Sequence, residues 1–596
     1  MKRSIKAALA SPVIKLCDPA YNSRIMAELA KSADGQGADI IVFPELSLTG
    51  ATAGDLYFQD VLIEATEAAL SDFVKATAPL KIMSFIGLPV KHGYSVYNGV
   101  ACVSGGEIIG ISASAKETRH FASVRDGFTM TVAGCEVEVA RDNIYTCEGA
   151  EADIFVKVGD DNAFSNDSVN LIINPIAMAE YVGLRDERRE YAKDVSSALG
   201  IPYIIVGAGE GESGTDGIYG GPRLAAVGEE IALESDLFDS AVLYADIDIR
   251  VKKAKQRTYD GAKEISKHPF IPKKDEDLLL AFEIQSRGLA HRIERAYAKT
   301  AVIGVSGGLD STLAVLVAAR AMDVCGLPRD RVIAITMPCF GTTERTKGNA
   351  LALAEELGCS VRTIDIKAAV KQHFNDISHD EKSYDVVYEN AQARERTQIL
   401  MDVANAEGGM VIGTGDLSEL ALGFATYNGD HMSMYCVNGS VPKTLMRAMI
   451  TYLAGKYEAE GKERLAKVLF DVVNTPVSPE LLPVEDGENK QHTEKIVGPY
   501  ELHDFFLYYT VKYGYSPSKI YELALETFED YTGEEIGSYL DTFVRRFFSQ
   551  QFKRSCLPDG PRVTEISLSP RGAWQMPSDV SSTVWRSDLS RKVNNE

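Results

Sequence analysis

"AVIGVSGGLDSTLAVLVAARA", residues 301–321, decides the fold class of the second half of this 596-residue chain. Its first residues, Ala301 to Val305, predict a short buried strand, because a short apolar run bounded by turn residues is typical of a strand. From Thr312 onward the residues are good helix formers, and residues 306–311 between the two predict a turn. A strand, a glycine-rich turn and a helix in this order predict a layered α/β domain with a parallel sheet.

The turn has the composition of a phosphate-binding loop. Gly307 and Gly308 allow the backbone to approach an anion, Ser306 and Ser311 offer hydroxyl donors, and the helix that follows points free N–H groups at the ligand. Asp310, an acid in such a loop, makes sense only if a divalent cation lies between it and the phosphates. The Gly-Lys-Ser ending of a Walker A loop is absent. An ordinary glycine-rich turn without a ligand is the alternative.

Composition and charge limit the classes of function. A chain of this length predicts two to four domains, and a hydrophobic content of 45% with 25% charged residues is typical of a soluble globular protein. The net charge of −23 argues against nucleic acid as the main partner, and no apolar run is long enough to predict a transmembrane helix. The nine cysteines are scattered without zinc-ligand or disulfide spacing, so we expect a cytoplasmic location.

Strand and helix signals also alternate through the first half. Short apolar runs predict strands, and they lie at residues 38–45, 81–90, 169–175 and 201–209. Residues 185–200 have helical composition and end at a glycine. The sequence around residues 250–275 is charged, contains prolines and lacks hydrophobic periodicity, so we place a linker there. The predicted organisation is a domain at 1–255, a linker at 256–280 and a domain at 281–596.

The loop resembles the pyrophosphate loop of the N-type ATP pyrophosphatases, and four further stretches narrow the resemblance. They are "YENAQARERTQILMD" (388–402), "VIGTGDLSELALGFATYNGD" (411–430), "NGSVPKTL" (438–445) and "QQFKRSCLPDG" (550–560). Singly, each could supply solvated surface charges. In this order behind the loop, they resemble the synthetase domain of the NAD synthetase family from about residue 280 to 580.

The resemblance implies a Rossmann-like domain that binds ATP, deamido-NAD and magnesium. The matching ATP-binding positions are Gly304, Ser306, Gly307, Gly308, Asp310, Ser311, Thr414 and Lys443. The matching deamido-NAD positions are Asn390, Arg394, Glu419, Phe424, Thr426, Tyr427, Asp430 and Lys553. Asp310 and Glu419 match the magnesium ligands. The implied reaction is the ATP-dependent amidation of deamido-NAD to NAD, with release of AMP and pyrophosphate. Amidation of another carboxylate is the alternative. The residues at 390–430, which match a dinucleotide site, argue against it.

The first half resembles the nitrilase-like amidase domain that releases ammonia from glutamine in the fuller members of this family. The stretch "GADIIVFPELSLTGATAGDLYFQD" (37–60) matches its first signature, with Glu45 as the general base of a Glu-Lys-Cys triad. Lys116 is the candidate for the triad lysine, although its register is uncertain. The implied fold is an αββα sandwich.

One strand departs from that family. Where family members read like "EICED", this chain reads Lys-Val-Gly-Asp-Asp, so that Gly159 stands at the nucleophile position. Ala51 and Ala53 replace the usual Tyr and Cys after "LTG", and the loop after Lys116 is short. We therefore predict a silent glutaminase site and an enzyme that uses ammonia.

Two alternatives to a silent site stay open. Glutamine could still be hydrolysed through a relocated nucleophile, for which Cys135 and Cys147 are candidates. The first half could instead be a structural module that organises oligomers or docks a separate glutaminase. The family forms homo-oligomers, so the resemblance implies one here.

Overall fold

The computed structural model describes residues 4–159, 168–249, 265–340, 344–475 and 498–593. The chain divides into two compact units. Unit 1 is built from the first half of the sequence, and unit 2 from the second half together with two short segments of the first, Tyr181–Gly183 and Gly214–Gly217. The predicted domain boundaries stay a prediction, because residues 250–264 lie outside the described residues.

The first sheet of unit 1 has the strand order β14-β1-β2-β3-β4-β5-β7-β6. Its strands are β1 (Ser4–Leu9), β2 (Ile40–Val42), β3 (Met83–His92), β4 (Ser95–Ser104), β5 (Glu107–Ala113), β6 (Phe128–Val132), β7 (Cys135–Ala140) and β14 (Leu243–Asp248). Strands β1, β2 and β3 pair in parallel, and β3, β4 and β5 pair antiparallel. The turn between β2 and the next helix carries Glu45.

The second sheet of unit 1 has the order β13-β12-β11-β10-β9-β8. Its strands are β8 (Ile144–Cys147), β9 (Ala152–Val156), β10 (Leu171–Ile176), β11 (Tyr203–Gly207), β12 (Arg223–Val227) and β13 (Glu230–Glu234). Strands β9, β10 and β11 pair in parallel, and every residue of β11 is buried, as expected for a strand covered on both faces. The chain reaches Gly159 directly after the carboxyl end of β9.

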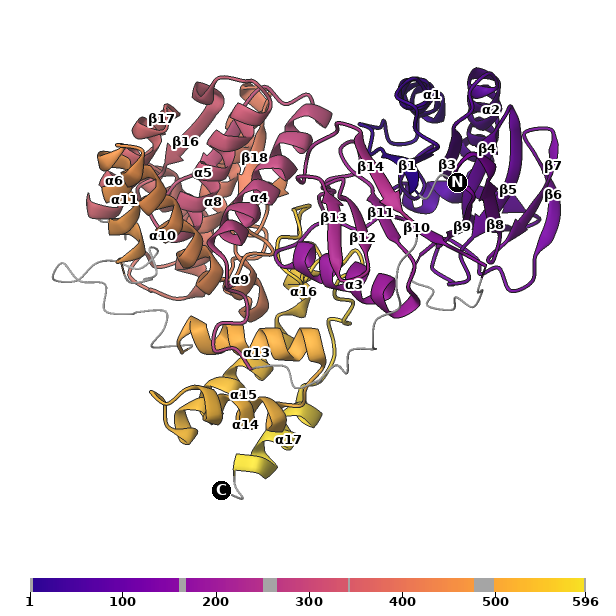
Figure 1. Ribbon diagram of the computed structural model, residues 1–596. Coiled ribbons are helices and arrows are strands. Elements are labelled where there is room, and N and C mark those ends of the chain that lie inside the picture. The colour runs from indigo at the N-terminus through magenta and orange to yellow at the C-terminus, as the bar shows by residue number, and fades with distance from the viewer. Residues whose placement is uncertain (1–3, 160–167, 250–264, 341–343, 476–497, 594–596) are drawn as a thin grey trace. The chain divides into compact units, whose positions relative to one another are not determined.

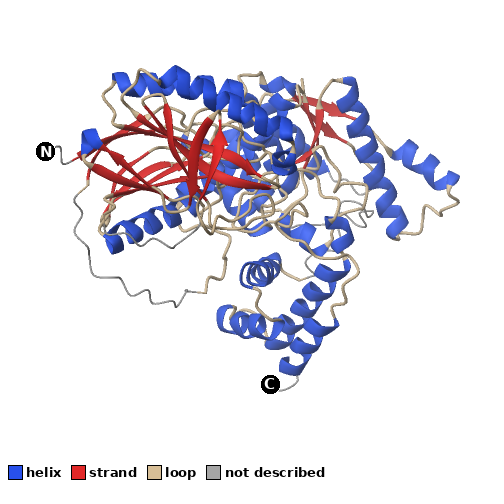
Figure 2. Cartoon of the chain, turned by 90° about the vertical axis from the view of Figure 1, so that its right-hand side faces the viewer, coloured by secondary structure: helices blue, strands red, loops and turns tan. Residues whose placement is uncertain are grey.

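The two sheets pack face to face and carry helices on their outer faces (Figure 2). One apolar cluster joins inward side chains of both sheets, among them Phe85 of β3 and Ile154 of β9. Helices α1 (Pro19–Gly35) and α2 (Asp60–Thr77) cover the first sheet, and α3 (Leu184–Leu199) covers the second. Single 3₁₀ turns are η1 (Gly54–Phe58) and η2 (Glu148–Ala150). The predicted αββα sandwich is confirmed.

Unit 2 contains a parallel sheet with the order β17-β16-β15-β18-β19. Its strands are β15 (Ala301–Gly304), β16 (Val332–Thr336), β17 (Ser360–Thr363), β18 (Met410–Gly413) and β19 (Tyr435–Cys436). The chain first adds strands on one side of β15 and then returns to add β18 on the other side. The strand order therefore reverses at β15, and ligands bind at the carboxyl ends of the strands beside such a reversal.

Helices cover this sheet (Figure 1). They are α4 (Asp275–Arg295), α5 (Leu309–Val324), α6 (Glu344–Glu356), α7 (Lys367–Asp376), α8 (Val386–Ala406), α9 (Leu417–Leu422), α10 (Lys443–Ala459) and α11 (Glu463–Val473), with the 3₁₀ turn η3 (Arg329–Arg331). Helix α5 is buried nearly all round, because it lies against β15 and β16 and is covered by α4 and α10. Helix α4 begins at Asp275 inside the predicted linker, where three acidic residues favour a helix amino terminus.

The carboxyl-terminal part of unit 2 is helical. Its helices are α13 (Tyr500–Tyr513), α14 (Pro517–Thr527), α15 (Gly533–Ser549), α16 (Gln551–Arg554) and α17 (Thr583–Val593). Helix α15 begins with a capping box in which Thr532 and Glu535 exchange hydrogen bonds. After α16 the chain runs past Gly214–Gly217, where the Gly560 N–H donates to the Thr215 carbonyl at 3.0 Å. No helix in the described part of the chain is long and apolar enough to cross a membrane.

Candidate active site

A cavity of about 640 Å³ lies in unit 2, beside the carboxyl ends of β15 and β18. The predicted ligand residues that line it are Gly304, Ser306, Gly307, Gly308, Asp310, Ser311, Asn390, Thr414, Glu419, Phe424, Thr426, Asp430, Lys443 and Lys553. Arg394 and Tyr427 lie outside this lining, and the Arg394 guanidinium donates to the Tyr427 carbonyl at 3.3 Å. Their predicted contact with deamido-NAD therefore stays a prediction.

Hydrogen bonds between serine hydroxyls and backbone groups fix the shape of the turn after β15. The Gly308 N–H donates to the Ser306 hydroxyl at 3.2 Å, and the Ser311 hydroxyl donates to the Gly308 carbonyl at 3.3 Å. Gly307 has a φ of +89°, which a residue with a side chain adopts only with strain. Because α5 starts at Leu309, its free N–H groups and its partial positive charge face the cavity, as an anion site requires.

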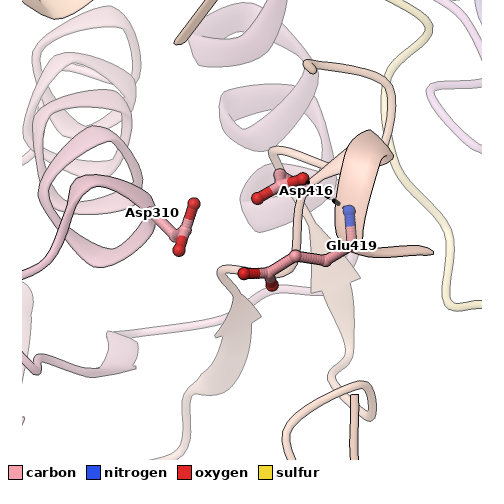
Figure 3. A group of neighbouring side chains, drawn as sticks. All are labelled: Asp310, Asp416 and Glu419. Carbon is pink, nitrogen blue, oxygen red and sulfur yellow. Dashed lines mark hydrogen bonds between the residues drawn. The ribbon is translucent and has the colours of Figure 1, made fainter. Parts of the chain in front are cut away.

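Three carboxylates, which we call the acidic cluster, converge at this turn (Figure 3). They belong to Asp310 at the start of α5, Asp416 at the amino cap of α9, and Glu419 in the first turn of α9, and one oxygen of each lies within 4.8 Å of the others. The Asp416 carboxylate also accepts the Glu419 N–H at 2.9 Å, which fixes the start of α9. The sequence prediction contained Asp310 and Glu419 but missed Asp416.

The ammonium of Lys443 lies among the three carboxylates. Its Nζ is 2.6 Å from Asp310 Oδ1, 2.6 Å from Asp416 Oδ2 and 2.9 Å from Glu419 Oε1. The Asp416 side chain is fully buried, whereas those of Asp310 and Glu419 are 27% and 24% exposed. Asp416 is therefore the inner partner of Lys443, and the other two carboxylates are open to the cavity.

The charges of this group do not cancel. Burial raises the pKa of Glu419 to about 7, with Asp310 adding to the rise and Lys443 opposing it. Burial lowers the pKa of Lys443, but the three carboxylates outweigh it and hold that pKa well above its usual value. Three carboxylates and one ammonium leave a formal excess of two negative charges, which one divalent cation would neutralise. Hard oxygen donors of this kind fit magnesium.

A second wall of the cavity is the segment that follows α9. The Thr426 hydroxyl donates to Asn390 Oδ1 at 2.7 Å, and the Thr426 N–H donates to Asp430 Oδ1 at 2.6 Å, so these three predicted residues form one network. Lys553 of α16 donates to the carbonyls of Gly423 and Ala425, each at 2.7 Å. The predicted residues of α8, of this segment and of α16 are thus brought together by hydrogen bonds.

Several lining residues escaped the sequence prediction. Arg546 of α15 lies with its guanidinium 4.0 Å from the centre of the Phe424 ring. Asp216 and Arg571 also line the cavity and form a bidentate ion pair at 2.7–3.0 Å. Residues so distant in sequence carry no local motif that would join them, because their meeting depends on the tertiary fold.

The predicted glutaminase residues of unit 1 are linked through two other residues, Asn98 and Ser114. The Asn98 amide donates to the Glu45 carboxylate, and the Ser114 N–H donates to the Asn98 carbonyl at 3.0 Å. The Lys116 N–H donates to the Ser114 hydroxyl at 3.1 Å, while the Lys116 side chain is exposed. A Cβ atom added to Gly159 would lie 3.1 Å from the Ser114 Oγ, so that Gly159 belongs to the same neighbourhood. The two acids after Gly159 lie outside the described residues.

Neither candidate for a relocated nucleophile lies near Gly159. Cys147 pairs with Ala152 at the far end of β9, seven residues or about 20 Å from Gly159 at the rise of an extended chain. Cys135 starts β7, four residues before the position that pairs with Ile111, and Ser114 lies three residues beyond Ile111. Seven residues of extended chain again separate the two, which is about 20 Å. Cys147 is also buried in the core between the sheets.

A buried carboxylate binds the loop after "LTG", where the usual Tyr and Cys are replaced by Ala51 and Ala53. The carboxylate of Glu212, which is buried, accepts the Ala51 N–H at 2.7 Å, and the Thr52 N–H at 3.0 Å. It also accepts the Thr52 hydroxyl at 2.6 Å. Burial raises the pKa of Glu212, and these three donors oppose the rise. Glu212 thus holds this loop through backbone groups and one hydroxyl.

Comparisons with known proteins agree for both units. The family model for NAD synthase matches residues 282–525, and that for carbon-nitrogen hydrolase matches residues 6–130. The glutamine-dependent NAD(+) synthetase of Mycobacterium tuberculosis is 34% identical over 97% of this chain and 96% of that protein.

Two solved structures share the fold. A glutamine-dependent NAD(+) synthetase from Cytophaga hutchinsonii is 19% identical, with a TM-score of 0.81 over 99% of this chain and all of the other. That of Acinetobacter baumannii in complex with ADP is 20% identical, with a TM-score of 0.63 over 96% of this chain and 98% of the other. By these sequence and fold likenesses, the chain belongs to the family of glutamine-dependent NAD(+) synthetases.

Proposed function

We propose that this enzyme converts deamido-NAD to NAD with ATP and that free ammonia is its nitrogen donor. The cavity of unit 2 supports the first part, since it combines an anion-binding turn, an acidic cluster that fits magnesium, and lysines at two walls. The family membership supports the same reaction.

The chemistry follows from these groups. The carboxylate of deamido-NAD attacks the α-phosphorus of ATP, the bond to the β-phosphate oxygen breaks, and pyrophosphate leaves. The turn at residues 306–311 holds the phosphates through its N–H and hydroxyl groups, and Lys443, which the resemblance places near them, holds the acidic cluster together. Magnesium, held by Asp310 and Glu419, would supply Lewis-acid stabilisation of the phosphate oxygens. Ammonia then attacks the carbonyl of the mixed anhydride, AMP leaves, and the new nitrogen loses a proton.

The second part of the proposal rests on Gly159. An amidase of the Glu-Lys-Cys kind forms a thioester with glutamine, and a glycine offers no atom for that bond. All nine cysteines are described, and none lies between β9 and β10, where Gly159 stands. With no thiol at this strand end, Glu45 has no nucleophile to activate, and the covalent route to ammonia is closed.

Use of glutamine is the second candidate, and the relatives favour it. The proteins of Mycobacterium tuberculosis and Aquifex aeolicus that match along most of this chain are both named glutamine-dependent. A relocated nucleophile would be needed here, and the positions of Cys135 and Cys147 speak against it. The names of the relatives thus predict use of glutamine, whereas Gly159 predicts that glutamine is not used.

Three other features are part of the proposal. Unit 1 would then serve as a structural module or as the docking partner of a separate glutaminase that delivers ammonia. A homo-oligomer is expected from the family. A cytoplasmic location is supported by the nine cysteines, which are all free thiols.

The test is the formation of NAD, AMP and pyrophosphate from ATP, magnesium, deamido-NAD and ammonium chloride. We expect the three products in equal amounts. The variant Asp310→Ala should lose this activity while its circular dichroism stays unchanged, because its carboxylate belongs to the acidic cluster. Normal turnover in that variant, or no NAD from the native enzyme, would remove the assignment.

A further inference from the structure

Arg546 and Lys553 are two cations that line the second wall of the cavity. The Nε of Arg546 donates to the Leu422 carbonyl at 2.8 Å, and Lys553 donates to two further carbonyls of the same segment. No ion pair within 4 Å is found for either of them among the described residues. Burial lowers the pKa of Lys553, the charge of Arg546 lowers it further, and the Asp430 carboxylate opposes this fall.

A neighbouring arginine shows what a purely structural role would require. Arg554 is fully buried, and its Nη1 donates to the carbonyls of Leu420 and Ala421 at 3.1 and 2.9 Å, while its Nε donates to the Gln551 side chain at 2.9 Å. Its Nη2 donates to the Phe547 carbonyl. Every nitrogen of Arg554 thus caps a backbone or side-chain acceptor at the end of α9 and α15.

Arg546 differs from Arg554 in this respect. A guanidinium carries five N–H donors. In Arg546 only the Nε has an acceptor within the described chain, so that both Nη atoms retain their donors. The residue lines the cavity and is half-buried, and its plane is held 4.0 Å from the Phe424 ring. A planar fork with free donors, fixed by a ring and a carbonyl, suits a phosphate group.

We infer that Arg546, beside the Lys553 that the sequence resemblance already assigns to deamido-NAD, binds a phosphate anion of the substrate on this wall, and that the anion is the diphosphate of the dinucleotide. The turn at residues 306–311 and the free N–H groups at the start of α5 face the cavity and suit the nucleoside triphosphate. Arg546 and Lys553 lie instead against the segment at residues 422–425, which continues into Thr426 and its partner Asn390. Asp430 on this wall is engaged by the Thr426 N–H and makes no ion pair with Arg546.

The inference rests on the proposed function but can fail separately from it. Arg546→Gln is compared with Arg545→Gln, which removes a charge from the exposed neighbour on the same helix. Calorimetry of the native enzyme and both variants is run with deamido-NAD alone and with ATP and magnesium alone. Charge-assisted hydrogen bonds from arginine predict a ten- to hundredfold weaker affinity for deamido-NAD in Arg546→Gln. Arg545→Gln should stay within threefold of the native enzyme for both ligands.

Three results would overturn the inference. Equal deamido-NAD affinity in the two variants would remove Arg546 from the site. A loss confined to ATP would assign the residue to the other source of phosphate. Because Arg546 also caps the Leu422 carbonyl, Arg546→Gln could fail to fold. In that case Arg546→Lys, which keeps a donor and the charge but not the fork, should still weaken deamido-NAD binding at least fivefold, and an unchanged affinity would refute the inference.

Native enzyme serves as the reference for the proposed function. If it makes no NAD from deamido-NAD, the proposed function fails whatever the variants bind. If it makes NAD and the two variants bind deamido-NAD alike, only the inference about Arg546 fails.

Discussion

Lys443→Met should make the stability of unit 2 depend on divalent cations. In the native chain the Lys443 ammonium lies 2.6–2.9 Å from one oxygen of each carboxylate in the acidic cluster, and Asp416 is fully buried behind it. Methionine fills a similar volume but leaves three carboxylates without a counter-ion. Removing one partner of a buried ion pair costs about 3–5 kcal/mol.

Thermal unfolding in the presence and absence of magnesium measures this effect. A loss of about 3–5 kcal/mol lowers the melting temperature by several degrees in a unit of this size. Without ATP, magnesium at a hundredfold excess over its dissociation constant adds about 2.7 kcal/mol. Magnesium stabilises both proteins, but the excess negative charge of the cluster is three in Lys443→Met and two in the native enzyme, so we expect magnesium to restore most of the lost stability in the variant and to add less to the native enzyme.

The control is Lys456→Met, which removes an exposed lysine from the same helix α10. It should melt within about a degree of the native enzyme, since exposed charges contribute little. The reasoning is refuted if Lys443→Met melts like this control, or if magnesium stabilises the native enzyme and the variant equally. Either result would mean that the ammonium is not the counter-ion of the acidic cluster.

Two further predictions concern Gly159 and His291. Gly159→Cys should not restore glutamine use, because the backbone there has a φ of +75° and the new Cβ would lie 3.1 Å from Ser114 Oγ; glutamate release from glutamine measures it, and appreciable release would contradict the account. His291→Gln should remove an acid sensitivity. Burial, followed by Arg295 and Arg292, lowers the pKa of His291 to about 4. The unfolded chain therefore binds the proton first, and stability falls as the pH drops from about 6.5 toward 4. Melting at pH 7.5 and 5.5 should show a smaller difference in His291→Gln, and an equal difference would exclude this role.

The parts of the structure that sequence reasoning found are those with a local pattern. The turn at 306–311 follows directly from glycines between an apolar run and helix formers. The predicted strand at 201–209 contains β11, and the predicted helix at 185–200 agrees with α3 to within a residue at each end. Hydrophobic periodicity, together with glycines at the ends of elements, is enough to predict such strands and helices.

The parts that it missed depend on contacts between distant segments. Asp416 looks like an ordinary helix cap in the sequence, and only the fold brings Lys443 to it across 27 residues of chain. Arg546 follows another arginine in an amphipathic helix, and nothing local indicates which of the two faces the cavity. Charge and proline content around residues 250–275 also do not reveal that a helix begins at Asp275.

The nitrogen donor is tested most directly by measuring glutamate and NAD together. Purified enzyme is given ATP, magnesium and deamido-NAD with either glutamine, freed of ammonium, or ammonium chloride. With Gly159 in place of a nucleophile, we expect NAD from ammonium and almost none from glutamine, since loss of the nucleophile of a catalytic triad lowers turnover roughly 10⁶-fold. Glutamate that appears in step with NAD, and that a thiol alkylator abolishes, would contradict the account and show that one of the nine cysteines has taken over the reaction.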